Sequence, residues 1–94
     1  MLEPLCVLIA EDGAADRMLL SSIIRRQGHQ VLAASNGAEA VQLFQQQRPH
    51  IVLMDALMPV MDGFEAARRI KALAGETLVP VSYTHLRAHE TSLH

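Results

Sequence analysis

The chain has 94 residues, half of them hydrophobic, and a formal net charge of −2 at pH 7. This length fits one small domain, and the near-neutral charge excludes the basic surface of a typical nucleic-acid-binding protein. The sequence has no apolar run of membrane-spanning length and does not begin like a signal peptide. We therefore expect a packed cytoplasmic domain that binds neither nucleic acid nor membrane. The single cysteine, Cys6, is expected to be a buried small hydrophobe.

The first part of the chain predicts a strand followed by a helix. Residues 5–10 are continuously apolar, as in a parallel strand covered on both faces, and they run into Glu11 and Asp12. A helix is expected from about Ala15 to Gln27, where Gly28 stops it. Its apolar residues at helical spacing are Ala15, Met18, Leu19, Ile23 and Ile24.

The second strand and helix follow the same alternation. Residues 30–34 predict a short strand. Asn36 and Glu39 then have the spacing of a capping box, in which an N-cap side chain and an acid three residues later satisfy the first backbone N–H groups of a helix. Arg48-Pro49 closes that helix, because the residue before proline disfavours helical geometry.

A third strand and helix come next. Residues 51–54 are again continuously apolar and end at Asp55. Asp62 to Glu65 forms a second capping box, which predicts a helix through roughly Ala74. Capping explains Asp62 fully, so we assign it no chemistry. Residues 79–81 are expected to begin a fourth strand. Alternating strands and helices indicate an α/β layered fold.

Acidic side chains follow two of the predicted strands. Because ligands of parallel sheets gather at the carboxyl ends of the strands, we expect Glu11, Asp12 and Asp55 to meet in one crevice. Three carboxylates packed together repel one another unless a cation offsets them, and Mg²⁺ suits hard oxygen ligands best. One such acid could simply cap a turn, but three beside one loop favour a site. Arg17 lies on the first helix just beyond the acidic loop and could reach the site, but we expect it on the solvated face of that helix.

The loop after the third strand makes the pattern specific. It reads Met58-Pro59-x-Met61-Asp62-Gly63, and together with the acidic pair and the lone Asp55 it resembles the receiver domain of two-component response regulators. The likeness covers residues 1 to about 80. It implies a flavodoxin-like, doubly wound parallel sheet in three α/β/α layers.

The resemblance also implies roles for individual residues. Asp55 would accept a phosphoryl group from a sensor histidine kinase or a phosphotransfer protein. Asp12 would bind Mg²⁺ directly and Glu11 through water, and the backbone carbonyl of Leu57 would complete the set. A receiver of this kind is a signalling acceptor and not an enzyme.

The sequence changes character after residue 80. Residues 81–91 resemble the in-frame translation of a transposase adapter used in preparing sequencing libraries. We expect the natural gene to have been cut near codon 80, which leaves residues 81–94 as a tail without evolved function. The domain would then hold about four strands and three helices and lack its fifth strand and last two helices.

Two consequences follow for the truncated domain. Receivers place a hydroxyl residue at the end of the fourth strand, but the family spacing from Asp55 reaches His85 and not Thr84, so Thr84 is not assigned that role. A missing last helix would expose apolar strand surface, so we expect a marginally folded or self-associating chain.

Other functions use similar residues. A Mg²⁺-dependent phosphohydrolase of the haloacid-dehalogenase type usually has a second aspartate two residues after the nucleophile, where this chain has Leu57. A flavin binder would need a phosphate-cradling loop after the first strand, where Glu11 and Asp12 would repel phosphate. A receiver-like interaction domain that is never phosphorylated is the remaining alternative.

Overall fold

Strands and helices alternate along the whole described chain, as the sequence predicts. The computed structural model describes residues 3–56, 58 and 60–84. Its elements are β1 (Cys6–Ala10), α1 (Ala14–Arg26), β2 (Gln30–Ala34), α2 (Gly37–Gln47), β3 (Ile51–Asp55), α3 (Gly63–Ala74) and β4 (Val81–Thr84). The described residues thus contain four strands and three helices, the number expected.

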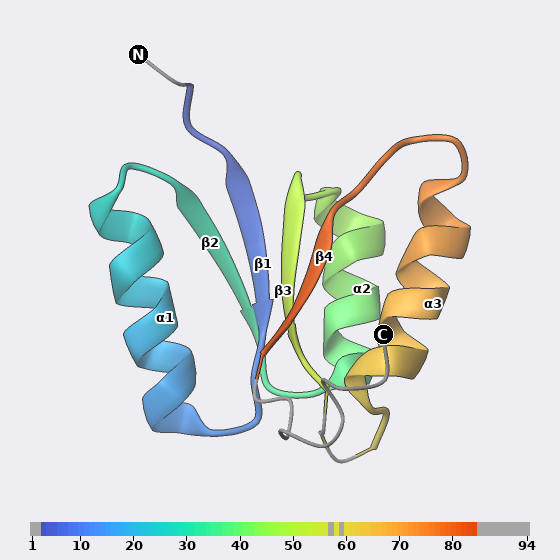
Figure 1. Cartoon of the computed structure of the whole chain (residues 1–94), viewed down its shortest axis with the longest axis horizontal. Helices are drawn as coiled ribbons and strands as arrows, with labels where there is room; N and C mark the ends of the chain where they lie inside the picture. The colour runs from blue at the N-terminus through green and yellow to red at the C-terminus, as the bar shows by residue number, and fades with distance from the viewer. Residues whose placement is uncertain (1–2, 57, 59, 85–94) are drawn as a thin grey trace, which may run out of the picture.

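The strands form one parallel sheet in the order β2-β1-β3-β4. Helix α1 covers one face of the sheet, and α2 and α3 lie side by side on the other (Figure 1). This is the flavodoxin-like three-layer arrangement, in which the chain first adds a strand on one side of β1 and then continues on the other. The carboxyl ends of all four strands therefore point to one edge of the sheet.

The main hydrophobic core lies between the sheet and the α2–α3 pair. Its largest members are at most 1% exposed: Leu8, Phe44, Val52, Met54 and Ile70. Burying one such side chain contributes about 1.5–3 kcal/mol, so this layer anchors β1 and β3. Both strands end at the acidic residues, and the core therefore fixes where those residues lie.

Both predicted N-caps are present, but the acid three residues later has other partners: Glu39 accepts the Ser35 N–H, and Glu65 pairs with Arg68 and Arg69. The side chain of Asn36 accepts a hydrogen bond from the Glu39 N–H at 2.8 Å, and that of Asp62 accepts one from the Glu65 N–H at 2.9 Å. Each such cap stabilises its helix by about 1 kcal/mol. The starts of α2 and α3 are thus confirmed.

Strand β4 differs from its predicted position. It begins at Val81 and not at residue 79, because Pro80 has no N–H to donate to a ladder. The Pro80 carbonyl instead accepts the Val52 N–H at 3.0 Å. All of β4 therefore lies inside the segment that we expected to be a tail; Val81 and Tyr83 are half-buried and Ser82 is exposed.

Helix α1 carries large apolar side chains that are exposed. Met18, Leu19 and Ile23 are 70%, 59% and 43% exposed, and the buried α1 residue is Ser21. On the strands, Val7 and Ile9 are 3% and 0% exposed. Large exposed apolar side chains thus lie on α1, and not on the strands, where the sequence analysis expected them.

The longest described helix has 13 residues, and none of the described helices has the length and apolar character that crossing a bilayer requires.

Candidate functional site

Three carboxylates converge at the carboxyl edge of the sheet. Glu11 and Asp12 directly follow β1, and Asp55 is the last residue of β3. The two strands are neighbours, with Ala10 paired to Met54, so their ends meet. One carboxylate oxygen from each of the three acids lies within 4.8 Å of the others. The structure therefore brings together the acids whose meeting the strand pattern predicts.

The burial of this cluster is uneven. Glu11 and Asp55 are 2% and 4% exposed, whereas Asp12 is exposed. One Glu11 carboxylate oxygen accepts the Gly13 N–H at 3.1 Å, which folds the side chain back over the loop. Packing negative charges in a buried setting costs free energy unless positive charge or hydrogen bonds compensate. The exposed Asp12 leaves the cluster open to solvent on one side.

The donor set fits a small hard cation. Mg²⁺ binds oxygen at about 2.0–2.1 Å in an octahedron, so oxygens that share its shell lie about 3–4 Å apart. In this structure one carboxylate oxygen of each acid lies within 4.8 Å of the others, which is close to that spacing. The backbone carbonyl of Leu57, expected as a further ligand, belongs to a residue outside those that the structure describes.

The start of α3 packs tightly against Asp55. The Gly63 N–H donates to the Ala56 carbonyl at 3.0 Å. A Cβ added at Gly63 would lie 2.1 Å from the Asp55 carbonyl oxygen, so only glycine allows this approach. Met58 and Met61 pack against the hydrophobic core. The backbone of Asp55 is thus enclosed by α3 while its carboxylate faces the acidic cluster.

Arg17 does not lie on a solvated face, so that prediction is wrong. One guanidinium nitrogen, Nη1, donates to the carbonyl oxygen of Glu11 at 2.8 Å and lies 3.4 Å from that of Asp12. The side chain is half-buried. The physical reason is that long side chains on a helix point back toward its N-terminus, and Arg17 stands one turn inside α1.

Thr84 is a site neighbour that sequence spacing missed. It pairs with Asp55 in the parallel ladder between β3 and β4, and the Ala56 N–H donates to its carbonyl at 3.4 Å. Its hydroxyl oxygen is buried and has no hydrogen-bond partner among the described residues. His85, which the family spacing indicated, lies outside the described residues. The sequence could have indicated this position of Thr84, because the last residues of adjacent parallel strands lie side by side.

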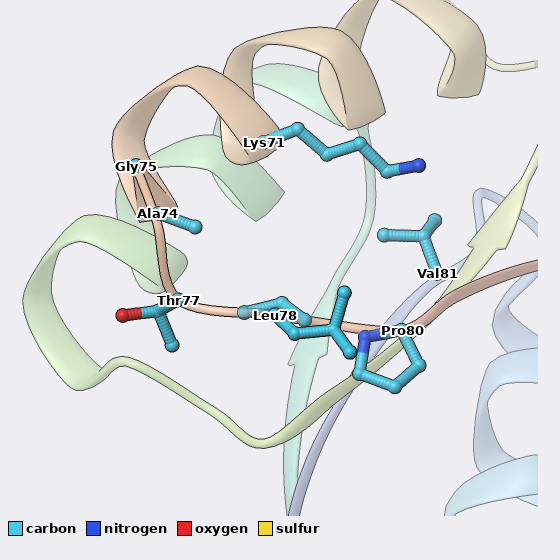
Figure 2. Close-up of a pocket in the computed structure, with 8 residues that line it drawn as sticks. Lys71, Ala74, Gly75, Thr77, Leu78, Pro80 and Val81 are labelled. Atoms are coloured by element: carbon cyan, nitrogen blue, oxygen red, sulfur yellow. The ribbon is translucent and has the colours of Figure 1, made fainter.

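One cavity of the described residues lies away from the acidic cluster. A cavity of about 300 Å³ is formed by the end of α3 and the connection to β4 (Figure 2). Lys71 reaches over it opposite Val81, and the remaining lining is largely aliphatic. Because β4 starts at Val81, this cavity lies at the sheet edge opposite the acids, where no convergent polar groups accompany it.

Comparisons with known proteins agree with this geometry. Residues 7–91 match the family model described as response regulator receiver domain. The chain is 36% identical over 85 residues to protein PilH of Pseudomonas aeruginosa, covering 90% of this chain and 70% of that protein. It is 42% identical over 93 residues to a protein-glutamate methylesterase/protein-glutamine glutaminase 4 of Myxococcus xanthus, covering 97% of this chain and 26% of that protein.

A solved structure supports the same relationship. It is the receiver domain of the sensor histidine kinase PA1611 from Pseudomonas aeruginosa, with a magnesium ion coordinated in its active-site cleft. The TM-score is 0.80 at 30% sequence identity, over 86% of this chain and 66% of that chain. The likeness therefore extends from sequence to backbone geometry.

Proposed function

Because this chain belongs to the response regulator receiver domain family, we propose that it is a phosphoacceptor of two-component signalling and that Asp55 takes the phosphoryl group. The observation that carries the proposal is the position of Asp55. Its carboxylate is buried at the end of β3, with oxygens of Glu11 and Asp12 within 4.8 Å. An aspartate that only capped a turn at the end of a strand would not need two further carboxylates beside it.

The chemistry is an in-line displacement at phosphorus. A carboxylate oxygen of Asp55 forms a bond to the phosphorus of a kinase phosphohistidine, and the P–N bond breaks as the imidazole leaves. The product is an acyl phosphate. Mg²⁺, when bound, would screen the negative charge that builds up between the carboxylate and the phosphoryl oxygens. Asp12 would hold the ion directly, Glu11 through water, and Leu57 through its backbone carbonyl.

The electrostatics of the chain support a cation at this position. Two of the three carboxylates are buried, and phosphate brings further negative charge to the same edge. The PA1611 receiver domain, at 30% identity, has magnesium coordinated in its cleft. We extend that chemistry to Glu11, Asp12 and Asp55 of this chain.

The partner is a sensor histidine kinase or a phosphotransfer protein. Its docking surface would include the first helix, where Met18 and Leu19 are 70% and 59% exposed. Apolar side chains exposed together are typical of protein interaction sites. They also support self-association of the chain when no partner covers them.

We also propose that residues 81–94 are adapter-derived and that the natural receiver continues differently after codon 80. Two observations bear on this: the family match runs to residue 91, and Val81–Thr84 forms β4. Four residues that alternate apolar and polar can fill a strand position whatever their origin. Sequencing the source DNA across codon 80 without a transposase adapter decides the matter. A frame that continues through the same tail would refute the adapter proposal.

The phosphoacceptor proposal is tested with the chain as it stands. The chain is incubated with a small phosphodonor and Mg²⁺, and intact mass and peptide mapping locate the phosphoryl group. We expect one group on Asp55, its loss in Asp55→Asn, and its loss when a chelator removes Mg²⁺. Asp62→Asn is the matched control, because asparagine caps a helix as well as aspartate does and Asp62 has no assigned chemistry.

Two outcomes would contradict the proposal. Labelling that persists in Asp55→Asn would place the acceptor elsewhere. Sustained turnover of a phosphate ester by the wild-type chain would instead identify a phosphohydrolase, because a receiver is a signalling acceptor and not an enzyme.

A further inference from the structure

We infer that Arg17 is a positioning residue for the metal-binding loop: its guanidinium holds the carbonyl groups of Glu11 and Asp12 and thereby fixes the direction of their carboxylates. The inference deepens the proposed function and rests on it, because it concerns Mg²⁺ binding at the same cluster. The arginine itself carries positive charge and is not a metal ligand.

The loop between β1 and α1 is held at several points. The Glu11 N–H donates to the Ala34 carbonyl at 3.0 Å, and the Gly13 N–H donates to a Glu11 carboxylate oxygen at 3.1 Å. Arg17 Nη1 donates to the Glu11 carbonyl at 2.8 Å and lies 3.4 Å from the Asp12 carbonyl. The bonds to Ala34 and Gly13 involve Glu11, whereas the guanidinium reaches the backbone carbonyls of both acids.

Arg17 is itself firmly placed. Its N–H donates to the Gly13 carbonyl at 2.8 Å in the first turn of α1. Its own carbonyl accepts the hydroxyl of Ser21 at 2.7 Å, and Ser21 is 5% exposed. A helix whose first turn is anchored in this way gives the guanidinium a fixed base. Outer-shell groups that orient metal ligands in this manner are known to govern affinity.

The positive charge of Arg17 by itself would weaken Mg²⁺ binding, whereas its positioning role would strengthen it. The guanidinium is positively charged, so electrostatics alone would make it oppose the binding of a divalent cation beside it. Positioning predicts that removing Arg17 weakens Mg²⁺ binding, whereas electrostatics alone predicts that removal strengthens it. The two effects differ in sign, and one titration therefore separates them.

The experiment measures Mg²⁺ affinity of the full 94-residue chain by calorimetry, with amide chemical shifts of Gly13 as a local probe. Arg17→Met keeps the length of the side chain and removes its donors. We expect about a tenfold increase in Kd, the usual cost of losing an outer-shell group. Arg17→Lys keeps one charged donor and should recover part of the affinity, to within about threefold of wild type.

Arg25→Met is the matched control. Arg25 lies on the same helix, is exposed, and has no recorded side-chain hydrogen bond within the described residues. Its loss changes the net charge equally and should leave Kd within about twofold of wild type, since exposed charges are strongly screened. The unfolding midpoint without Mg²⁺, measured for each variant, separates a loop effect from loss of the fold.

The outcomes are distinct. If wild type binds Mg²⁺ and Arg17→Met binds it equally or more tightly, the positioning role is overturned while the proposed function stands. If wild type itself binds no Mg²⁺ and accepts no phosphoryl group, the proposed function fails. If Arg17→Met does not fold, Arg17→Lys decides: affinity between that of wild type and one-tenth of it supports the role, and unchanged affinity refutes it.

Discussion

Thr84 lies beside Asp55 as its partner in the β3–β4 ladder, and its buried hydroxyl oxygen has no hydrogen-bond partner among the described residues. A buried polar atom without a partner costs about 1–3 kcal/mol. Beside a carboxylate that we propose to be phosphorylated, such a hydroxyl is a donor that phosphate oxygens could satisfy. In the unphosphorylated chain it is a source of instability.

Thr84→Val should therefore stabilise the unphosphorylated chain. Valine has nearly the same shape and removes the unsatisfied hydroxyl, so we expect a gain of about 1 kcal/mol in the free energy of unfolding. Urea unfolding followed by circular dichroism measures it. Thr77→Val, at an exposed threonine, is the control and should change little. A loss of stability in Thr84→Val would mean that the hydroxyl makes a favourable interaction.

Tyr83 reports on whether β4 packs on the sheet. Burial, and secondarily the negative charge of Asp62, raises the pKa of its phenol above the ordinary value of about 10. The ring also lies against Phe64, with ring centroids 4.8 Å apart. Because Tyr83 is the sole tyrosine, the tyrosinate absorbance titrates this one group.

We expect that titration to be displaced to higher pH, and Asp62→Asn to reverse only a small part of the displacement, since burial is the larger cause. The raised pKa also makes the free energy of unfolding depend on pH. The folded state holds the phenol proton more tightly than the unfolded state, so this stabilisation is complete below the ordinary pKa and declines as pH rises through the folded pKa. A titration at the ordinary value would mean that β4 is detached.

Gly63→Ala should be strongly destabilising. The added Cβ would meet the carbonyl oxygen of Asp55 at 2.1 Å, so α3 or β3 must shift. Overpacking of this kind costs about 1–3 kcal/mol. Thermal unfolding measures the loss. Gly13→Ala is the comparison, because its nearest new contact is 3.4 Å and its φ of −75° suits any residue. Equal midpoints for the two variants would contradict the close approach of α3.

Val60 is held in a backbone conformation that β-branched residues avoid, with φ of 72°. Asparagine tolerates this left-handed region, and Val60 is 85% exposed, so little burial is lost on replacement. We expect Val60→Asn to stabilise the chain by about 1 kcal/mol. Leu78→Asn, at another exposed apolar residue, should bring no such gain in the same denaturant titration.

The sequence predicted the features that local chemistry determines. Asn36 and Asp62 marked the starts of α2 and α3, because capping involves residues three apart. The meeting of Glu11 and Asp55 followed from parallel strands that end at one edge. Neither inference needed knowledge of distant packing.

The features that sequence analysis missed depend on tertiary geometry. The direction of Arg17 depends on how the loop after β1 folds back, which helical periodicity does not report. Thr84 was missed because counting residues along the chain from Asp55 does not report strand register, which places the two residues side by side.

Strand β4 pairs with β3, and within the described residues β3 is its sole hydrogen-bonded neighbour. The other edge of β4 therefore presents backbone N–H and C=O groups that are arranged to receive one more strand. Parallel pairing uses main-chain groups common to all sequences, so an extended segment of another molecule can pair there without a matching side-chain pattern. Within the described residues, this free side of β4 is therefore suited to backbone-mediated association.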